Sequence, residues 1–213
     1  MYNTILRCIK FRHALALSGS LLLLGLAVSR APAQTAERIQ QFSQSNTKDQ
    51  NRIGSAKEKL PEILYDLKKL PGPVLKKRNA ILQAAKTGDL NALKQVLADN
   101  KLVPNFSFGG EKDPLAFWKQ SSADKTGRDI LAEMVRVFSS GFVLFGAGTP
   151  NEVYIWPYHF AHPLDKLTPA QEVELYLLIT PEERKAMVDA GGYIGYRGGI
   201  SPNGTWQFFV AGD

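Results

Sequence analysis

The residue types most able to do chemistry gather in one short segment, from Tyr154 to Pro163. Its sequence, Tyr-Ile-Trp-Pro-Tyr-His-Phe-Ala-His-Pro, holds four aromatic side chains and two of the three histidines of the chain. Imidazole can ligate a metal or act as a general base, and aromatic faces with polar tips suit sugar or peptide ligands. The candidate ligand-binding side chains are therefore Tyr154, Trp156, Tyr158, His159 and His162.

A metal site would need further ligands around the two histidines. His159, His162 and Asp165 follow one another at intervals of three, with Glu152 nearby, and imidazole with carboxylate suits zinc. Prolines interrupt the segment on both sides, so it cannot form the regular helix that would bring such a spacing together. We assign no metal and no cofactor to the chain on this pattern.

Hydrolysis is the alternative to ligand binding. His159 or His162 would then serve as base or metal ligand, but the chain has no Gly-x-Ser-x-Gly motif to supply a serine nucleophile. Paired carboxylates are an equally weak signal. Glu172 and Glu174 lie two apart on a predicted helix, point to different faces and are expected to be solvated. The sequence leaves open whether the protein is an enzyme.

A purely structural role for the aromatic segment is the third interpretation. Large aromatic side chains are mainly core residues, and Trp156 with Phe160 could fill the junction between a sheet and its helices. A binding platform would instead expose Trp156, together with Tyr158 and Trp118. The direction in which Trp156 points separates these two interpretations.

The first 33 residues have the pattern of a secretory signal peptide. Basic residues precede an apolar run over 14–28, and Ala31-Pro32-Ala33 is a small-x-small cleavage site, which predicts a mature chain beginning at Gln34. A run of about 15 residues is shorter than the ~20 that a membrane-spanning helix needs. No twin-arginine pair precedes the run, so we expect Sec export, a periplasmic or secreted protein, and no transmembrane segment after cleavage.

Composition narrows the function classes further. Cys8 is the only cysteine, so the mature chain would have no disulfide, no thiolate metal site and no cysteine nucleophile, which favours a bacterial exported protein. Four of the 26 basic residues and none of the 20 acidic residues lie in 1–33, leaving 22 against 20. This balance gives no support to nucleic-acid binding.

We expect one α+β domain over 58–213, preceded by a flexible polar segment over 34–57 that holds few large apolar residues. Residues 58–140 are predicted to be mainly helical, and 141–213 to mix strands with helices. Apolar residues at helical spacing predict helices over 61–70, 74–86 and 127–139. Asp113 followed by Pro114 predicts the start of a further short helix.

The C-terminal part should contain four short strands and two helices. Thr168 and Thr180 each begin a capping box followed by proline, which predicts helices running to about 179 and 190. Strands are predicted over 142–145, 153–156, 193–198 and 205–211, and Ser201-Pro-Asn-Gly is a hairpin turn between the last two. The glycines of 191–199 suggest a bulged or closely approached strand, with Arg197 at the surface.

Three segments resemble an uncharacterised family of exported proteobacterial proteins with no assigned activity. They are Tyr154-Ile-Trp-Pro-Tyr158, Leu167-Thr-Pro-Ala-Gln-Glu-Val-Glu-Leu-Tyr176 and the C-terminal 199–213. The resemblance implies export and a single domain, and it supplies no catalytic residue. The sequence thus favours a periplasmic binding or interaction module for an envelope component or another periplasmic protein, and indicates no oligomeric state.

Overall fold

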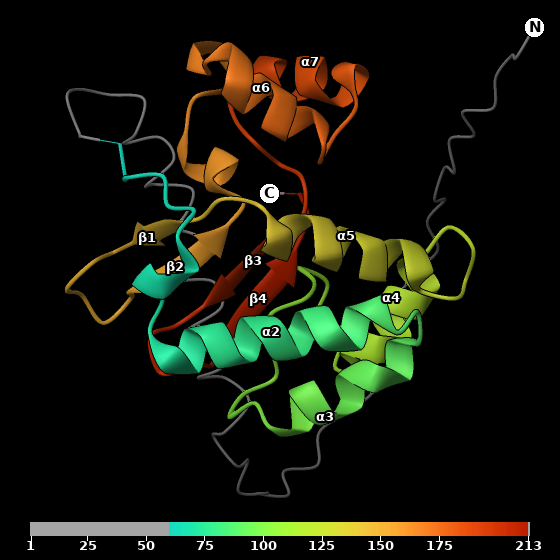
Figure 1. Cartoon of the computed structure of the whole chain (residues 1–213). Coiled ribbons are helices and arrows are strands. Elements are labelled where there is room, and N and C mark those ends of the chain that lie inside the picture. Colours follow the sequence, from blue (N-terminus) through green and yellow to red (C-terminus); the bar gives the residue numbers. More distant parts are fainter. Residues whose placement is uncertain (1–59, 213) are drawn as a thin grey trace, which may run out of the picture. The chain divides into compact units, whose positions relative to one another are not determined.

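An antiparallel sheet of four strands forms the centre of the computed structural model, which describes residues 60–212 (Figure 1). The strands are β1 (Val143–Phe145), β2 (Val153–Trp156), β3 (Arg197–Ile200) and β4 (Trp206–Val210), and they lie side by side in chain order. Sequence neighbours therefore pair throughout, as in a meander. The described residues all belong to one compact unit.

Six α-helices occur in the described part of the chain, with short 3₁₀ turns between them. The first four precede the sheet and the last two are inserted between β2 and β3. They are α2 (Gly72–Lys86), α3 (Leu93–Ala98), α4 (Pro114–Ser121), α5 (Arg128–Ser139), α6 (Pro169–Tyr176) and α7 (Pro181–Asp189). The 3₁₀ turns are η1 (Leu67–Lys69), η2 (Leu90–Ala92), η3 (Tyr158–Ala161) and η4 (Leu164–Lys166).

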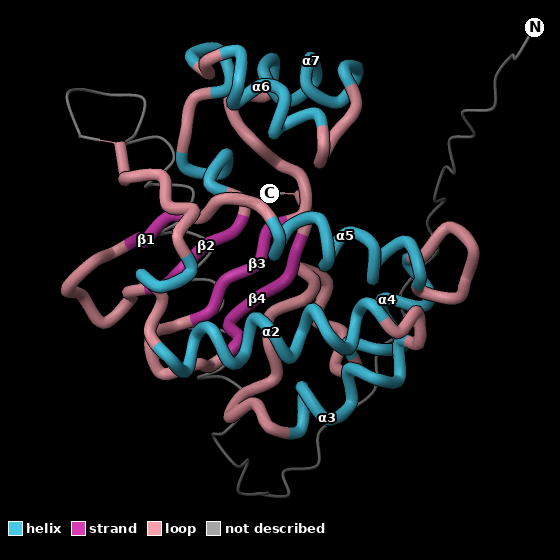
Figure 2. The backbone as a smooth tube through the Cα atoms, viewed as in Figure 1, coloured by secondary structure: helices cyan, strands magenta, loops and turns pink. Residues whose placement is uncertain are grey.

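Helices α2 and α5 cross one face of the sheet (Figure 2). Side chains alternate between the two faces of a strand, so Tyr154 and Trp156 of β2 meet these helices, while Val153 and Ile155 face away from them. The resulting main core joins the helices to strand residues that include Trp156, Trp206 and Phe209. The buried stripe of α5, with Met134, Val137 and Phe138, has the spacing that predicted this helix.

The alternate strand residues and the inserted helices form two smaller clusters. On the opposite face of the sheet the buried side chains are those of Val143, Val153, Ile155, Phe208 and Val210. Helices α6 and α7 pack on each other through Leu175 and Met187, with Tyr193 joining them from the segment before β3. These clusters tie the inserted helices to the sheet through the chain around η3 and η4.

Both edges of the sheet are closed by residues from outside it. Leu64 exchanges two backbone hydrogen bonds with Phe142 at 2.8 and 2.9 Å, and Asn105 does the same with Gln207 and Phe209 at 2.8 Å each. The helix predicted over 61–70 is therefore wrong. The unpaired edge of β1 takes the backbone of Leu64, and only Leu67–Lys69 keeps a helical turn.

Local signals predicted most helix starts correctly. Thr168 and Thr180 each form a complete capping box, and the Asp113 carboxylate accepts hydrogen bonds from two backbone N–H groups at the start of α4. The two boxed helices are slightly shorter than predicted. Helix α6 ends at Tyr176 and α7 at Asp189.

The strand predicted from Tyr193 begins later, at Arg197. The Tyr193 hydroxyl donates to the Tyr196 carbonyl at 3.1 Å, which closes residues 193–196 into a turn. The hydroxyl lies so close to Gly195 that an added Cβ there would be 2.6 Å from it. Further along, the register shifts between Gly199 and Ile200, and the extra residue, Gln207, lies in β4. The predicted close approach to the glycine strand is confirmed, since an added Cβ would lie 2.4 Å from Phe138 at Gly198 and 2.3 Å from Phe208 at Gly199. Arg197 is only 8% exposed and donates to the Gly212 carbonyl, so its predicted surface position is wrong.

The mixed α+β class predicted from the sequence is confirmed. The predicted signal peptide over 1–33 and the polar segment over 34–57 lie outside the described residues. None of the helices within 60–212 has both the length and the apolarity that a bilayer crossing needs.

Candidate functional site

The side chains of the predicted binding segment lie inside the protein. Trp156 is fully buried, with its ring 5.6 Å from that of Phe138 and 5.2 Å from that of Phe142. Tyr154 lies on the same face of the sheet and is 7% exposed, and Trp118 is 1% exposed. Trp156 thus points into the main core, and the two tryptophans offer no open face to a ligand.

Tyr158 and Glu174 form a polar contact between η3 and α6. The Tyr158 hydroxyl donates to Glu174 Oε2 at 2.8 Å, and the half-exposed Tyr65 donates to the same carboxylate at 2.9 Å. Burial, followed by the bond to the carboxylate, raises the pKa of Tyr158. The expected solvation of Glu174 is therefore wrong, since its carboxylate ties two distant segments to α6.

His159 is fully buried and held as a neutral ring. Its Nε2 lies 3.2 Å from the Gln171 carbonyl, which can only accept, so this nitrogen carries the proton. Nδ1 has no hydrogen-bond partner, so a second proton would leave a buried donor unpaired. Burial lowers the pKa of His159 to about 4, and the ring stacks on Tyr158 at 3.9 Å.

His162 is half-buried and also bonds to backbone. Its Nδ1 lies 3.1 Å from the Tyr158 carbonyl, and burial lowers its pKa. The metal ligands considered from the sequence and not assigned, His159, His162 and Asp165, belong to no group of three or more His, Cys, Asp or Glu side chains able to hold an ion within 60–212. Both imidazoles act here as packing and hydrogen-bonding groups between η3 and its surroundings.

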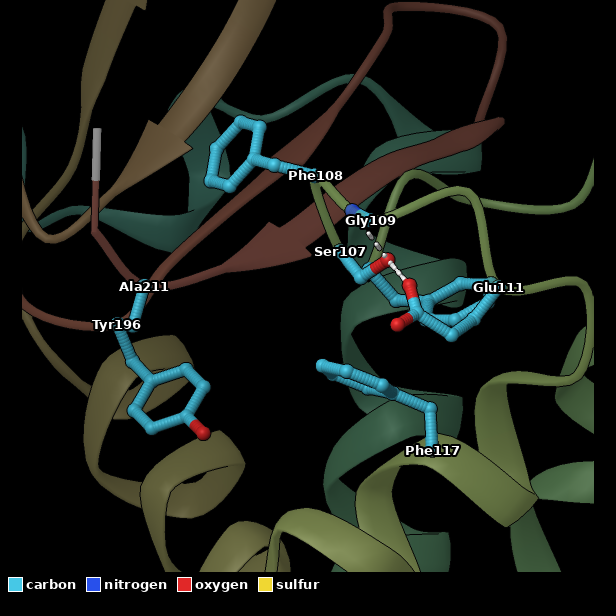
Figure 3. A pocket seen from close by; sticks show the side chains of 8 residues that line it. Ser107, Phe108, Gly109, Glu111, Phe117, Tyr196 and Ala211 are labelled. Atoms are coloured by element: carbon cyan, nitrogen blue, oxygen red, sulfur yellow. Dashed lines mark hydrogen bonds between the residues drawn. The ribbon is translucent and has the colours of Figure 1, made fainter. Parts of the chain in front are cut away.

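A separate cleft, open to solvent, lies between the 106–111 loop, α4 and the residues that flank β3 and β4. We call it the aromatic cleft. It measures about 250 Å³ and is lined by Phe106, Ser107, Phe108, Gly109, Glu111, Phe117, Tyr196 and Ala211. Figure 3 shows Phe117 and Tyr196 pointing toward each other across the hollow, with Ser107 and Glu111 to one side. Aromatic walls with a few polar groups are typical of small-molecule sites, although this one lies just below the usual range of about 300–1,000 Å³.

Four separate parts of the fold build the walls of the aromatic cleft. The 106–111 loop follows Asn105, which is bonded to the β4 backbone, while Phe117 comes from α4. Phe106 packs on Phe117 with ring centroids 5.4 Å apart. Across the hollow, Tyr196 stacks on Phe209 at 5.0 Å. Each wall is thus backed by a second ring, so the cleft is preformed.

The polar side of the aromatic cleft is a serine and a carboxylate. The Ser107 hydroxyl donates to Glu111 Oε2 and in turn accepts from the Gly109 N–H at 3.3 Å. A Cβ at position 109 would lie 2.7 Å from Glu111 Oε1, so the carboxylate can take this position only because residue 109 is glycine. The bond from Ser107 lowers the pKa of Glu111. Such a carboxylate is a weak base at neutral pH and suits charge recognition better than proton abstraction.

The sequence analysis singled out no residue of the 103–112 segment as a candidate site residue. Two phenylalanines flanking a serine in a glycine-rich, solvent-accessible loop were the available signal, and Phe108 is indeed 48% exposed. The contributions of Phe117 and Tyr196 come from elements about 10 and 90 residues away, and spacing alone does not join them.

Comparison with known proteins adds no assignment, since no family model, curated protein or solved structure matches this chain.

Proposed function

We propose that this chain is an exported binding protein, and that the aromatic cleft is where it holds a small ligand or one side chain of an envelope partner. The single observation that carries the proposal is a preformed hollow with rings on two walls and one carboxylate. The hydrolase alternative gains no support, because His159 is fully buried and the half-buried His162 has its Nδ1 at the Tyr158 carbonyl, so both imidazoles bond to backbone. The export part rests on the sequence of 1–33.

A fragment screen by NMR tests the binding part. The ¹⁵N-labelled full chain, purified after any processing by its bacterial host, is titrated with water-soluble cationic, anionic and neutral fragments. We expect amide shifts to concentrate at 106–111 and around Tyr196 and Ala211. Phe117→Leu should weaken these hits because it removes one aromatic wall while keeping an apolar side chain.

Tyr176→Leu is the matched control for that variant. Tyr176 is also an accessible ring, 44% exposed on α6, but it lies outside the aromatic cleft. Hits that survive Tyr176→Leu and weaken in Phe117→Leu support the cleft. Hits that respond equally to both variants, or a screen without hits in the 106–111 loop, would refute it.

The export part has its own measurement. The chain is expressed with residues 1–33 in a Gram-negative host, and the periplasmic fraction is analysed by intact mass. Cleavage after Ala33 should give a product beginning at Gln34. A full-length product confined to the cytoplasm would contradict export and leave the cleft hypothesis standing.

A further inference from the structure

The charge of the aromatic cleft points to the class of its ligand. Glu111 is the one charged residue among the eight that line the hollow, and its side chain is solvent-accessible beside Ser107. No lysine or arginine lines the cleft to neutralise it. A ligand that enters therefore meets a carboxylate with its charge uncompensated by the walls.

The walls favour the same sign of ligand charge. Phe106, Phe117 and Tyr196 present π-systems, whose faces are negative and attract cations within about 6 Å of the ring centroid. Two further carboxylates act on the Tyr196 wall from α5. After burial, the charges of Glu133 and Asp129 are what raise the pKa of Tyr196. Arg136 forms an ion pair with Glu133 in α5, so the charge of this carboxylate at the Tyr196 wall is partly neutralised, and the rings and Glu111 carry the preference for a cation.

The few oxygen ligands and the aromatic walls of the cleft exclude some classes of cation. One carboxylate and one hydroxyl fall far short of the six to eight oxygens that Ca²⁺ takes, so a bare metal ion is a poor fit. A primary ammonium is compact and strongly hydrated, and aromatic walls do not replace its water. A methylated ammonium has apolar methyl groups around its charge. It therefore gains binding free energy both from contact with the rings and from attraction to the nearby carboxylate.

We infer that the aromatic cleft binds a small organic cation with a methylated ammonium head, with Glu111 as its counter-ion and Phe106, Phe117 and Tyr196 as its walls. This inference rests on the proposed function, because it specifies the ligand class of the same cleft. The cavity of about 250 Å³ admits the head of such a molecule, and the remainder would extend through the open side.

Choline and its neutral isostere 3,3-dimethylbutan-1-ol provide the test, since they differ mainly in a positive nitrogen replaced by carbon. Each is titrated into the ¹⁵N-labelled full chain while the amides of 106–111 are followed. We expect choline to bind about tenfold more tightly than the isostere. In Glu111→Gln the ratio of the two affinities should shrink severalfold, while the affinity for the isostere stays unchanged. The substitution keeps the shape of the side chain and removes its negative charge.

Glu182→Gln controls for net charge. Glu182 is exposed in the first turn of α7, outside the aromatic cleft, so this variant should keep the preference for choline. Equal affinities for choline and the isostere, or a preference that Glu111→Gln leaves intact, would overturn the cation inference. If neither compound binds but other fragments still shift 106–111, the inference fails and the proposed function stands. If no fragment binds there, both fail.

Discussion

Acidification from pH 6.5 to pH 4 should destabilise this protein through His159. The buried ring is neutral in the folded state, with a pKa of about 4, whereas in the unfolded chain its pKa returns to the ordinary 6.5. Between these values the unfolded state binds one proton more than the folded state, so the free energy of unfolding falls as the pH falls. Above pH 6.5 neither state is protonated and the contribution is fully present.

The size of the effect follows from the interval between the two pKa values. Each pH unit within it removes about 1.4 kcal/mol, so the whole interval removes about 3 kcal/mol from the free energy of unfolding. This is a large share of the ~5–15 kcal/mol that holds a typical domain folded. The main physical cause is burial, which removes the water that would stabilise a charged imidazolium, and the protonated Nδ1 would also be a buried donor without an acceptor.

Urea unfolding at a series of pH values from 4 to 7.5, followed by tryptophan fluorescence, measures the effect. His159→Gln should be less stable than the parent protein at pH 7, because the stacking on Tyr158 is lost. Between pH 6.5 and pH 4, its free energy of unfolding should fall by about 3 kcal/mol less than that of the parent protein. Carboxylates such as Glu133, whose pKa is raised by burial, titrate in both proteins and cancel in the difference.

His162→Gln is the matched control. Burial lowers the pKa of His162 as well, so its removal should flatten the pH profile in the same direction, but by less, because the ring is only half-buried. The reasoning is refuted if His159→Gln keeps the slope of the parent protein between pH 4 and 6.5. It is equally refuted if NMR titration gives His159 a pKa near 6.5.

Four further substitutions, one of them a control, test the packing, a helix end and a polar contact, each by urea unfolding at pH 7. Gly198→Ala should cost about 1–3 kcal/mol, because the new Cβ would lie 2.4 Å from the ring of Phe138 in the main core, whereas Gly192→Ala meets no atom within 4 Å and should change little. Thr180→Ala should cost about 1 kcal/mol, because it removes the side chain that caps α7. Tyr65→Phe should cost under about 1 kcal/mol, since the lost hydroxyl is solvent-accessible and the carboxylate keeps its other tyrosine.

The elements that sequence reasoning predicted well are those whose causes are local. The capping boxes at Thr168 and Thr180 satisfy backbone N–H groups within three residues, and they form as predicted. The turn over 201–204 closes through a 2.8 Å bond from the Gly204 N–H to the Ser201 carbonyl. Helix α5 follows from its own apolar stripe, whose period needs no knowledge of the partner surface.

The predictions that failed depend on distant partners. Leu64 has the spacing of a helical residue, but the free edge of β1, nearly 80 residues away, offers it two backbone hydrogen bonds. Arg197 has no sequence signal for burial, and only the fold brings the Gly212 carbonyl within 2.7 Å of its guanidinium. Intrinsic propensities are small beside such tertiary contacts, which therefore decide the conformation.

The two aromatic segments show why a high density of rings in the sequence does not by itself indicate an accessible surface. In 153–156 the residues alternate between two sheet faces that are both buried, so Trp156 and Tyr154 enter the main core while their neighbours enter the smaller cluster. In the 106–111 loop only one side has a core to fill. Phe106 packs inward at 6% exposure, and Phe108 remains at the rim of the cleft at 48%.

An aromatic residue therefore indicates core packing in the strand over 153–156 and, at Phe108, an accessible surface in the 106–111 loop. A strand buried on both faces gains free energy from every ring it carries, so aromatic residues there need no ligand to explain them. A loop ring that stays in contact with water has no such explanation, and the hydrogen bonds that tie Asn105 to β4 hold the start of the loop in place. A partly exposed ring on an anchored loop, beside a carboxylate without a basic neighbour in the cleft, is for that reason what favours the aromatic cleft as a proposed binding site.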